Sequence, residues 1–230
     1  MTDRKVTLVV TSCGRFDLLE KTLISFFKYN TYPIEECIIV EDSGKVKDLN
    51  FLNDILKVPT RFLINPQNLG QMPSIDRAYA EVKTSYIFHC EDDWEFYKPG
   101  FIEESFRVLD ADPRVFTVWL RAHNDTNNHP IEPDVHQVGD VKYYYMGTKK
   151  KWFGFTLNPG LRKTSDCMRF HPITTLEPLV KKRGGMHVVH EVDLSVYYKD
   201  AGYKCAMVFD PEGYVKHIGW DDHLPMPWEK

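Results

Sequence analysis

Three adjacent acids end an apolar run near the middle of the 230-residue sequence. The stretch YIFHCEDDWEF runs into Glu91, Asp92 and Asp93, and Glu95 follows after one tryptophan. Clustered carboxylates repel one another, so a cation or water must compensate their charge. Oxygen-rich clusters suit Mg2+ and Mn2+, and Mg2+ usually binds through one or two carboxylates plus substrate phosphates. The cluster therefore predicts either a metal site that grips a diphosphate or a solvated acidic turn, and we assign Glu95 to solvent.

Strands and helices must position these acids, and their patterns alternate through the first half of the chain. β-branched and apolar runs predict strands, and apolar residues at helical spacing predict helices. The predicted strands are 5–12, 36–44, 60–66 (which stops at Pro66), 85–93 and 114–122, and the predicted helices are 17–29, 49–57, 72–82 and 100–112. This alternation predicts an α/β fold with a mostly parallel sheet flanked by helices.

Polar residues also close the first two predicted strands. Thr11 and Ser12 end the first strand, and Glu41 and Asp42 come late in the second. Ligands of such sheets bind at the carboxyl ends of the strands. We therefore expect these residues to converge with the acidic cluster that ends the fourth strand.

Local signals mark some of the element ends. Asp17, with Glu20 three residues later, resembles a capping box for the first helix. The segment 124–139 is rich in Asn, Asp, His and Pro, and is predicted to be a long loop. Helical spacing returns in 190–204, where Gly202 is a predicted helix stop.

Composition limits the class of protein. A 43% hydrophobic content supports a packed core, and 230 residues suit one large domain. The net charge of −4 gives no basic field for nucleic acid, so we expect no such partner. No apolar run approaches the ~20 residues of a membrane span. The apolar segment near the start is too short for a secretory signal, and the five cysteines lack CxxC spacing. We expect a cytoplasmic protein with reduced thiols.

Four short motifs occur in an order typical of one enzyme family. They are the opening VTLVVTSCGRFDLLEKTLISFF, the acid pair in CIIVEDSG, the N-x-G loop in NPQNLGQ and the strand that runs into EDD. Together they resemble the nucleotide-binding half of the GT-A glycosyltransferases, in the family 2-like group, over about residues 5–110. A looser similarity lies in HEVDLSVYYKDAGYK, where the family opens an acceptor-side helix with an acid pair.

The resemblance implies a single GT-A domain over 1–230, a Rossmann-like nucleotide-diphospho-sugar transferase fold. Residues 1–110 would be the nucleotide-sugar-binding half and 111–230 the acceptor-side half. The implied activity is transfer of a sugar from a nucleotide-diphosphate sugar, with UDP-sugar favoured, to an acceptor hydroxyl. Mn2+ or Mg2+ is the implied cofactor. A glycan, a lipid-linked molecule or a protein would be the acceptor, and peripheral association or a homo-oligomer stays open.

The same resemblance implies which residues of this chain bind the metal and the donor. Asp93 matches the metal ligand of the DxD motif, and His217 resembles a late His that some members supply to the metal or diphosphate. Asp42 matches the acid that reads uracil or an equivalent base. The implied donor-binding residues are Thr11, Ser12, Arg15, Glu41, Asp42, Asn68, Gly70, Asp76, Glu91 and Asp92.

Glycosyl transfer also needs a base that deprotonates the acceptor hydroxyl as it attacks. Glu191 matches the second acid of the family's acceptor-side pair, with His190 in place of the first. Asp193 is the alternative base, and either acid would also suit a helix N-terminus without any chemistry. Trp152 and Trp220 lie near glycines in loop-like sequence and are candidate sugar platforms.

Two rival functions fit parts of the pattern. A sugar nucleotidyltransferase shares the sheet type and the metal, although TSCGRF is a poor version of its Gly-rich loop. A non-catalytic module that binds a nucleotide-sugar or glycan would keep the fold. The presence of both EDD and HEVD favours an enzyme. We expect a metal-dependent, hexosyltransferase-type glycosyltransferase that inverts the anomeric centre.

Overall fold

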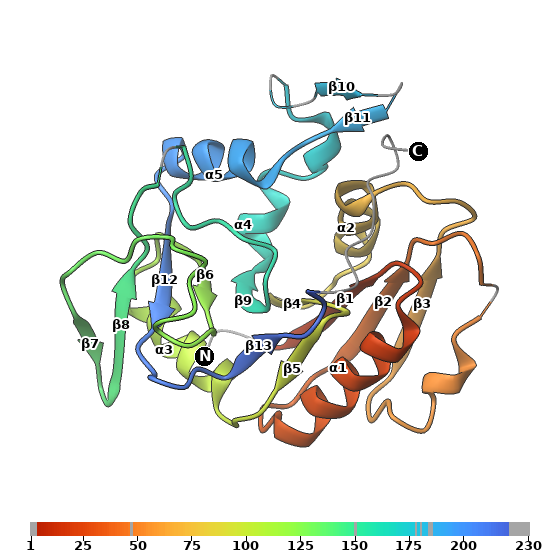
Figure 1. Cartoon of the computed structure of the whole chain (residues 1–230), viewed down its shortest axis with the longest axis horizontal. Helices are drawn as coiled ribbons and strands as arrows, with labels where there is room; N and C mark the ends of the chain where they lie inside the picture. Colours follow the sequence, from red (N-terminus) through yellow and green to blue (C-terminus); the bar gives the residue numbers. More distant parts are fainter. Residues whose placement is uncertain are drawn as a thin grey trace.

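The computed structural model describes residues 4–46, 48–149, 151–177, 179, 181–183 and 186–220, with backbone alone for 181–183 and 186–188. Its first half alternates strands and helices as predicted (Figure 1). The elements are β1 (Val6–Ser12), α1 (Phe16–Tyr29), β2 (Glu36–Glu41), β3 (Thr60–Ile64), α2 (Gln71–Ala80), β4 (Tyr86–Glu91), β5 (Trp94–Phe96) and α3 (Phe101–Ala111).

The second half is less regular. Its elements are β6 (Val115–Trp119), β7 (His136–Val138), β8 (Val141–Tyr145), β9 (Gly160–Lys163), α4 (Thr164–Met168), β10 (Lys181–Arg183), β11 (Met186–Val188), α5 (Glu191–Asp200), β12 (Lys204–Val208) and β13 (Val215–His217). Of these, the sequence pattern predicted β6 and α5 and did not reveal the others. The predicted loop 124–139 is irregular until β7. Gly202 has φ +91° just after α5, which confirms the predicted helix stop.

Two local predictions are wrong. The segment 49–57 forms a single 3-10 turn, Asn50–Leu52, instead of a helix. Its Asn and Asp side chains favour turns, since they compete with the helical hydrogen bonds. The capping box at Asp17 also fails, because α1 begins at Phe16 and Arg15 takes the N-cap position. The guanidinium of Arg15 is drawn to the acidic cluster instead.

The central sheet confirms the predicted fold class. Its strand order is β3-β2-β1-β4-β9, in which the first four strands are parallel and β9 is antiparallel to β4. Both faces are covered by helices. Along β1, Leu8 and Val10 join the core on the side of α1 and α3, whereas Val9 joins the core on the side of α2. This double burial explains the almost continuous apolar runs of the strands.

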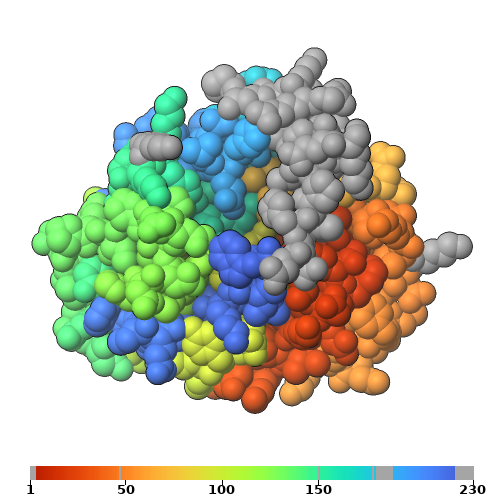
Figure 2. All heavy atoms as spheres, in the orientation of Figure 1, coloured from red at the N-terminus to blue at the C-terminus, as the bar shows by residue number. Residues whose placement is uncertain are grey.

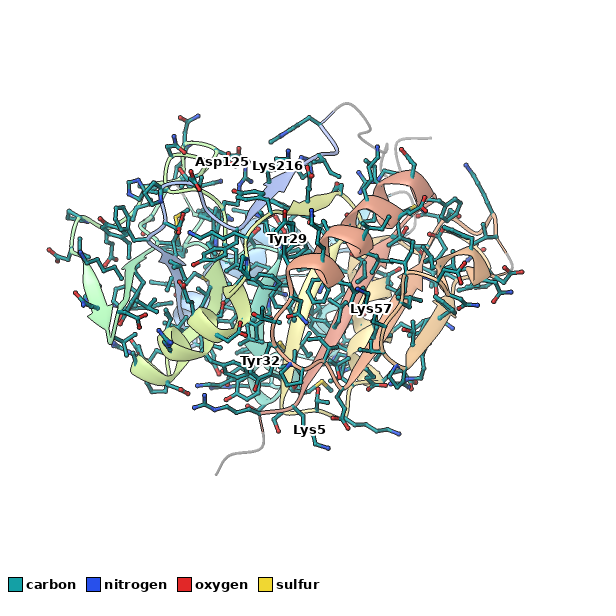
Figure 3. All side chains as sticks on the ribbon, turned by 90° about the horizontal axis from the view of Figure 1, so that it is seen from below. Lys5, Tyr29, Tyr32, Lys57, Asp125 and Lys216 are labelled. Atoms are coloured by element: carbon teal, nitrogen blue, oxygen red, sulfur yellow. The ribbon has the colours of Figure 1, made fainter. Side chains whose placement is uncertain are left out.

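A second sheet and a short ribbon complete the molecule. The second sheet has the order β6-β12-β8-β7, and β13 pairs with β5 in an antiparallel ribbon. Figure 3 shows Lys5, just before β1, and Lys216, in β13, at opposite edges of the molecule. The ribbon therefore lies toward the carboxyl ends of the central strands. None of the helices in the described ranges is both long and apolar enough to cross a membrane.

Candidate active site

A cavity of about 490 Å3 lies at the carboxyl ends of β1, β2 and β4. The polar residues predicted to converge from these strand ends do so. Of the residues named from the sequence, those that line the cavity are Thr11, Ser12, Arg15, Asp42, Asn68, Gly70, Glu91, Asp92, Asp93, Glu191 and His217. Glu41, Asp76 and Asp193 are not among the lining residues.

Figure 2 shows the blue segment around β13 between the red N-terminal part and the green part of the surface.

One arginine forms ion pairs with both aspartates of the acidic cluster. Arg15 binds Asp92 through Nη2, and its Nη1 lies 2.8 Å from Asp93 Oδ2. Burial raises the pKa of Asp92 to about 6, although Arg15 opposes the rise. Burial acts in the same direction on Asp93, but His217 and Arg15 together hold its pKa below the ordinary value. Asp93 is therefore the aspartate that stays ionised most readily.

Glu91 differs from its two neighbours. Its carboxylate accepts hydrogen bonds from Gln71 Nε2 at 2.7 Å and from Trp94 Nε1 at 3.4 Å. Burial, and then the charges of Asp93 and Glu191, raise its pKa well above the ordinary value. This shift favours the protonated form of Glu91, which lowers the repulsion within the cluster.

The segment after β13 closes the cavity over Asp93. His217 Nε2 lies 3.2 Å from Asp93 Oδ2, and the Ile218 amide donates to the Asp93 carbonyl at 2.8 Å. A Cβ on Gly219 would meet Asp93 Cβ at 2.7 Å. Glycine is therefore required where this segment crosses the aspartate. The ring of Trp220 packs edge-on against His217, with centroids 4.5 Å apart.

Asp93 and His217 fit the role of metal ligands. Asp93 Oδ1 and His217 Nδ1 are buried, and no described residue supplies either with a hydrogen-bond partner. The described residues contain no group of three or more His, Cys, Asp or Glu side chains that could hold a metal by themselves. Two protein ligands suffice when a substrate diphosphate supplies others, as is usual for Mg2+. The donor set is therefore compatible with a hard divalent cation.

Asp42 anchors the loop beside the cavity. Its Oδ1 accepts from Asn65 Nδ2 at 2.7 Å and from the Leu69 amide at 2.8 Å, and its Oδ2 accepts from the Gly70 amide at 2.8 Å. Burial raises its pKa, and these hydrogen bonds oppose the rise. A residue that lines the cavity thus also fixes the backbone of the N-x-G loop. Asn68, in the same loop, donates to Cys13 Sγ.

Two residues that were expected to contact the donor instead accept hydrogen bonds from backbone amides of the protein. Glu41 is 0% exposed, and its carboxylate accepts from the Ser43 amide at 2.7 Å and the Gly14 amide at 3.2 Å. It ties the turns after β1 and β2 together beneath the cavity. Asp76, in α2, accepts from the amides of Ile173 and Thr174 at 2.7 and 2.9 Å. It therefore anchors the segment 173–175, which the sequence pattern could not reveal.

Glu191 begins α5 on the far side of the cavity from α1. Its Oε1 accepts from the Leu157 amide at 2.8 Å. Burial raises its pKa, while the Leu157 amide and the charge of Arg162 oppose the rise. Asp193 lies in the first turn of the same helix, where an acid stabilises the helix dipole. Only Glu191 of these two acids lines the cavity.

Sequence reasoning missed several residues of the acceptor side. Arg121, Asn127 and Asn158 line the cavity there. Arg121 follows β6, so its position at the end of a strand could have marked it as a site residue. Asn127 and Asn158 lie in irregular segments, where no sequence pattern marks them.

The prediction that Trp152 is a sugar platform is wrong. The residue is 9% exposed and stacks on His129 in the core, with ring centroids 3.8 Å apart. Trp220 lines the cavity and is 63% exposed.

Comparison of the sequence with protein families gives one decisive match. The family model described as glycosyl transferase family 2 matches residues 7–170. The chain belongs to glycosyl transferase family 2. Glycosyl transfer is accordingly the general activity that the match supports, as the sequence motifs implied. A comparison with curated proteins finds no match.

Solved structures place this family 2 chain in the GT-A fold. It is similar to S. aureus TarS 1-349, with a TM-score of 0.57 and 13% identity, over 92% of this chain and 59% of that one. It is also similar to the mannosyltransferase PcManGT from Pyrobaculum calidifontis, solved with GDP-Man and Mn2+, with a TM-score of 0.60 and 14% identity, over 90% of this chain and 55% of that one. The chain thus spans little more than half of each. Identities this low show the shared fold and no more.

Proposed function

We propose that this chain transfers a sugar from a nucleotide-diphosphate sugar, with UDP-sugar favoured, to an acceptor hydroxyl, and that it uses Mn2+ or Mg2+ and inverts the anomeric centre. One observation carries the proposal. A single cavity is lined by Asp92 and Asp93 at the end of β4 and by Glu191 from α5. Leaving-group stabilisation and base catalysis need two such carboxylate stations.

The donor half would bind the diphosphate at the acidic cluster. Asp93 and His217 would hold the divalent cation, which when bound neutralises the charge that develops on the leaving diphosphate. Arg15 is a second source of positive charge at this point, since its guanidinium lies against Asp92 and Asp93. The turn formed by Thr11, Ser12 and the N-x-G loop would position the nucleoside.

The acceptor half would supply the base and a binding surface. Glu191 would take the proton of the attacking hydroxyl, and its burial favours a pKa closer to neutrality than that of an exposed carboxylate. Trp220 offers an exposed ring at the cavity, and Asn127 and Asn158 offer amide groups. Rings and amides of this kind suit a sugar, so a glycan, lipid-linked or protein-linked acceptor fits.

The role of Glu191 as the general base is tested with the variant Glu191→Gln. Asp193→Asn is the matched control on the same helix. We expect Glu191→Gln to lower transfer by about 10²- to 10⁴-fold, because it removes the proton acceptor. Donor binding should be unchanged, as read from the rise in melting temperature with UDP-sugar and Mn2+. Asp193→Asn should transfer normally. A fully active Glu191→Gln would move the base elsewhere, and an inactive Asp193→Asn would point to Asp193.

The donor is tested by a melting-temperature screen with UDP-, GDP-, dTDP- and CMP-sugars, each with and without Mn2+. A ligand that binds the native state raises the melting temperature by mass action. We expect the largest rise with a UDP-sugar plus Mn2+. Binding without transfer across a broad acceptor panel would instead indicate a binding module.

A further inference from the structure

Arg162, in β9, is a buried cation to which the described part of the chain offers no carboxylate partner. It is 1% exposed, and the rings of Phe116 and Phe155 flank its guanidinium at 6.0 and 5.8 Å. Across the described ranges, no carboxylate lies within 4.0 Å of it. Burial of an unpaired cation costs several kcal/mol in folding free energy. The residue therefore needs an explanation beyond core packing.

The hydrogen bonds of Arg162 lead toward Glu191. Its Nη2 donates to the Thr156 carbonyl at 2.6 Å, and its Nη1 donates to Tyr79 Oη at 2.9 Å. The next amide after that carbonyl belongs to Leu157, and it donates to Glu191 Oε1 at 2.8 Å. One peptide unit thus connects the guanidinium to the carboxylate.

The segment 153–157 is held from two sides. Ser195, one turn after Glu191 in α5, accepts from the amides of Phe153 and Phe155 at 2.7 and 3.4 Å. Arg162 holds the carbonyl of Thr156 from the side of the central sheet, where β9 pairs with β4. The Leu157 amide is therefore fixed in position relative to α5.

We propose that Arg162 is a positioning residue for glycosyl transfer, which holds the peptide 156–157 so that its amide orients the Glu191 carboxylate in the cavity. The inference rests on the proposed function, since it takes Glu191 as the base. A fixed base has a large effect, because a displacement of about 1 Å in a reacting group can cost about 100-fold in rate. The fork of the guanidinium suits this task, since it binds a carbonyl and a hydroxyl at once in a fixed geometry.

The charge of Arg162 acts on the same carboxylate. The titratable groups whose pKa it influences are Tyr79 of α2, His89 of β4, Cys167 of α4, Cys205 of β12, and Tyr198 and Glu191 of α5. Burial favours the neutral form of each of these groups, because it raises the pKa of the tyrosines, the cysteines and Glu191 and lowers that of His89. Glu91, Arg121 and His217 line the same cavity as Glu191, and His190 and Asp193 lie beside Glu191 in the first turn of α5.

Removal of the charge has a defined sign. Arg162 lowers the pKa of Glu191, so its loss raises that pKa further. A base works when it is deprotonated, and the transfer rate therefore falls as the pH falls through its pKa. The acid limb of the rate profile should move to higher pH in Arg162→Met and stay in place in Arg162→Lys.

The experiment compares Arg162→Met, Arg162→Lys and the control Tyr79→Phe. Tyr79→Phe removes a hydroxyl bound to the same guanidinium but leaves its charge and its contact with Thr156. We expect kcat to fall about 100-fold in Arg162→Met, with the melting-temperature rise on addition of UDP-sugar and Mn2+ unchanged. Arg162→Lys should recover part of kcat. Tyr79→Phe should lower the melting temperature yet keep kcat close to the wild-type value. Equal kcat losses in Arg162→Met and Tyr79→Phe, with the acid limb unmoved, would show a structural role and overturn the inference.

Direct titration of Glu191 separates this inference from the proposed function. Carboxyl-labelled glutamate is followed by 13C NMR in the wild type and in Arg162→Met, and Glu191→Gln assigns the signal. If Arg162→Met does not fold, Arg162→Lys is used for the test. The pKa of Glu191 should then equal the wild-type value, because the positive charge remains. The kcat should still fall, because lysine lacks the two-pronged guanidinium. An unmoved Glu191 titration in Arg162→Met, with Glu191→Gln inactive, overturns the inference alone. A fully active Glu191→Gln overturns the proposed function and, with it, the role of Arg162 in transfer.

Discussion

Asp92 and Asp93 are adjacent, share Arg15 and nevertheless differ in chemistry. Burial raises the pKa of Asp92 to about 6, whereas His217 and Arg15 hold the pKa of Asp93 below the ordinary value despite its burial. A carboxylate must be deprotonated to bind a metal, so Asp93 is the better ligand. Asp92 also accepts from the Cys13 amide at 3.2 Å, which ties it to the turn after β1.

At the residue scale we predict that Asp93→Asn removes metal-dependent turnover. The neutral amide loses the charge that attracts the cation, and we expect turnover with Mn2+ and UDP-sugar to fall by at least about 100-fold. The measurement is turnover as a function of Mn2+ concentration. Glu95→Gln is the control from the same segment, because within the described residues the ion pair of Glu95 is with exposed Lys216, 2.8 Å away. Equal Mn2+ dependence in Asp93→Asn and the wild type would remove Asp93 from the metal site.

At the element scale, Asp76 joins α2 to the segment 173–175. Its carboxylate accepts from the Ile173 and Thr174 amides and from Thr174 Oγ1 at 2.7 Å. We predict that Asp76→Ala lowers the free energy of unfolding by about 2–4 kcal/mol, because buried donors lose their acceptor. Urea unfolding measures this loss, and Asp17→Ala, at an exposed acid of α1, should stay within about 0.5 kcal/mol of the wild type.

The same variant tests whether Asp76 contacts the donor. Asp76 does not line the cavity, so the affinity for UDP-sugar should be unchanged in Asp76→Ala. Weakened donor binding in a variant of unchanged stability would restore the contact that the family resemblance implied.

The crossing of Gly219 over Asp93 gives a second prediction at this scale. In Gly219→Ala the new Cβ would lie 2.8 Å from Asp93 Oδ2, so the aspartate or the segment must move. We expect Mn2+ affinity to fall by about 10-fold or more, since the ligand is displaced. A Mn2+ titration measures the change. Lys216→Ala, in β13, alters an exposed side chain of the same segment and should bind Mn2+ normally. Unchanged Mn2+ affinity in Gly219→Ala would place the metal away from Asp93.

At the scale of the whole molecule, the two halves named from the sequence interlock. Strand β9, from the second half, completes the first-half sheet beside β4, and β13 pairs with β5. A boundary near residue 110 would leave β4 and β5 with unpaired edges. We therefore predict one cooperative unfolding transition for the chain. Tryptophan fluorescence and circular dichroism should give the same urea midpoint, and two separated midpoints would show that the halves are independent domains.

Residues that act through local patterns could be predicted from the sequence. The carboxyl ends of β1, β2 and β4 are marked by short apolar runs, and the strand-end rule brought Thr11, Asp42 and Asp93 to one cavity. Glu191 came from the resemblance of the HEVD segment to the family's acceptor-side acid pair. These features depend on periodicity and on the direction of parallel strands, which neighbouring residues encode.

Only the tertiary structure decided how these groups are held and which of them face the cavity. The contact of His217 with Asp93 joins positions 124 residues apart, and that of Thr174 with Asp76 joins positions 98 apart. The burial of Trp152 and that of Arg162 likewise depend on segments distant in the chain. No local pattern specifies such contacts, because they arise when separately formed elements pack. The sequence by itself therefore determined the sheet and its strand-end chemistry, and packing separated the acids that line the cavity from those that anchor the backbone around it.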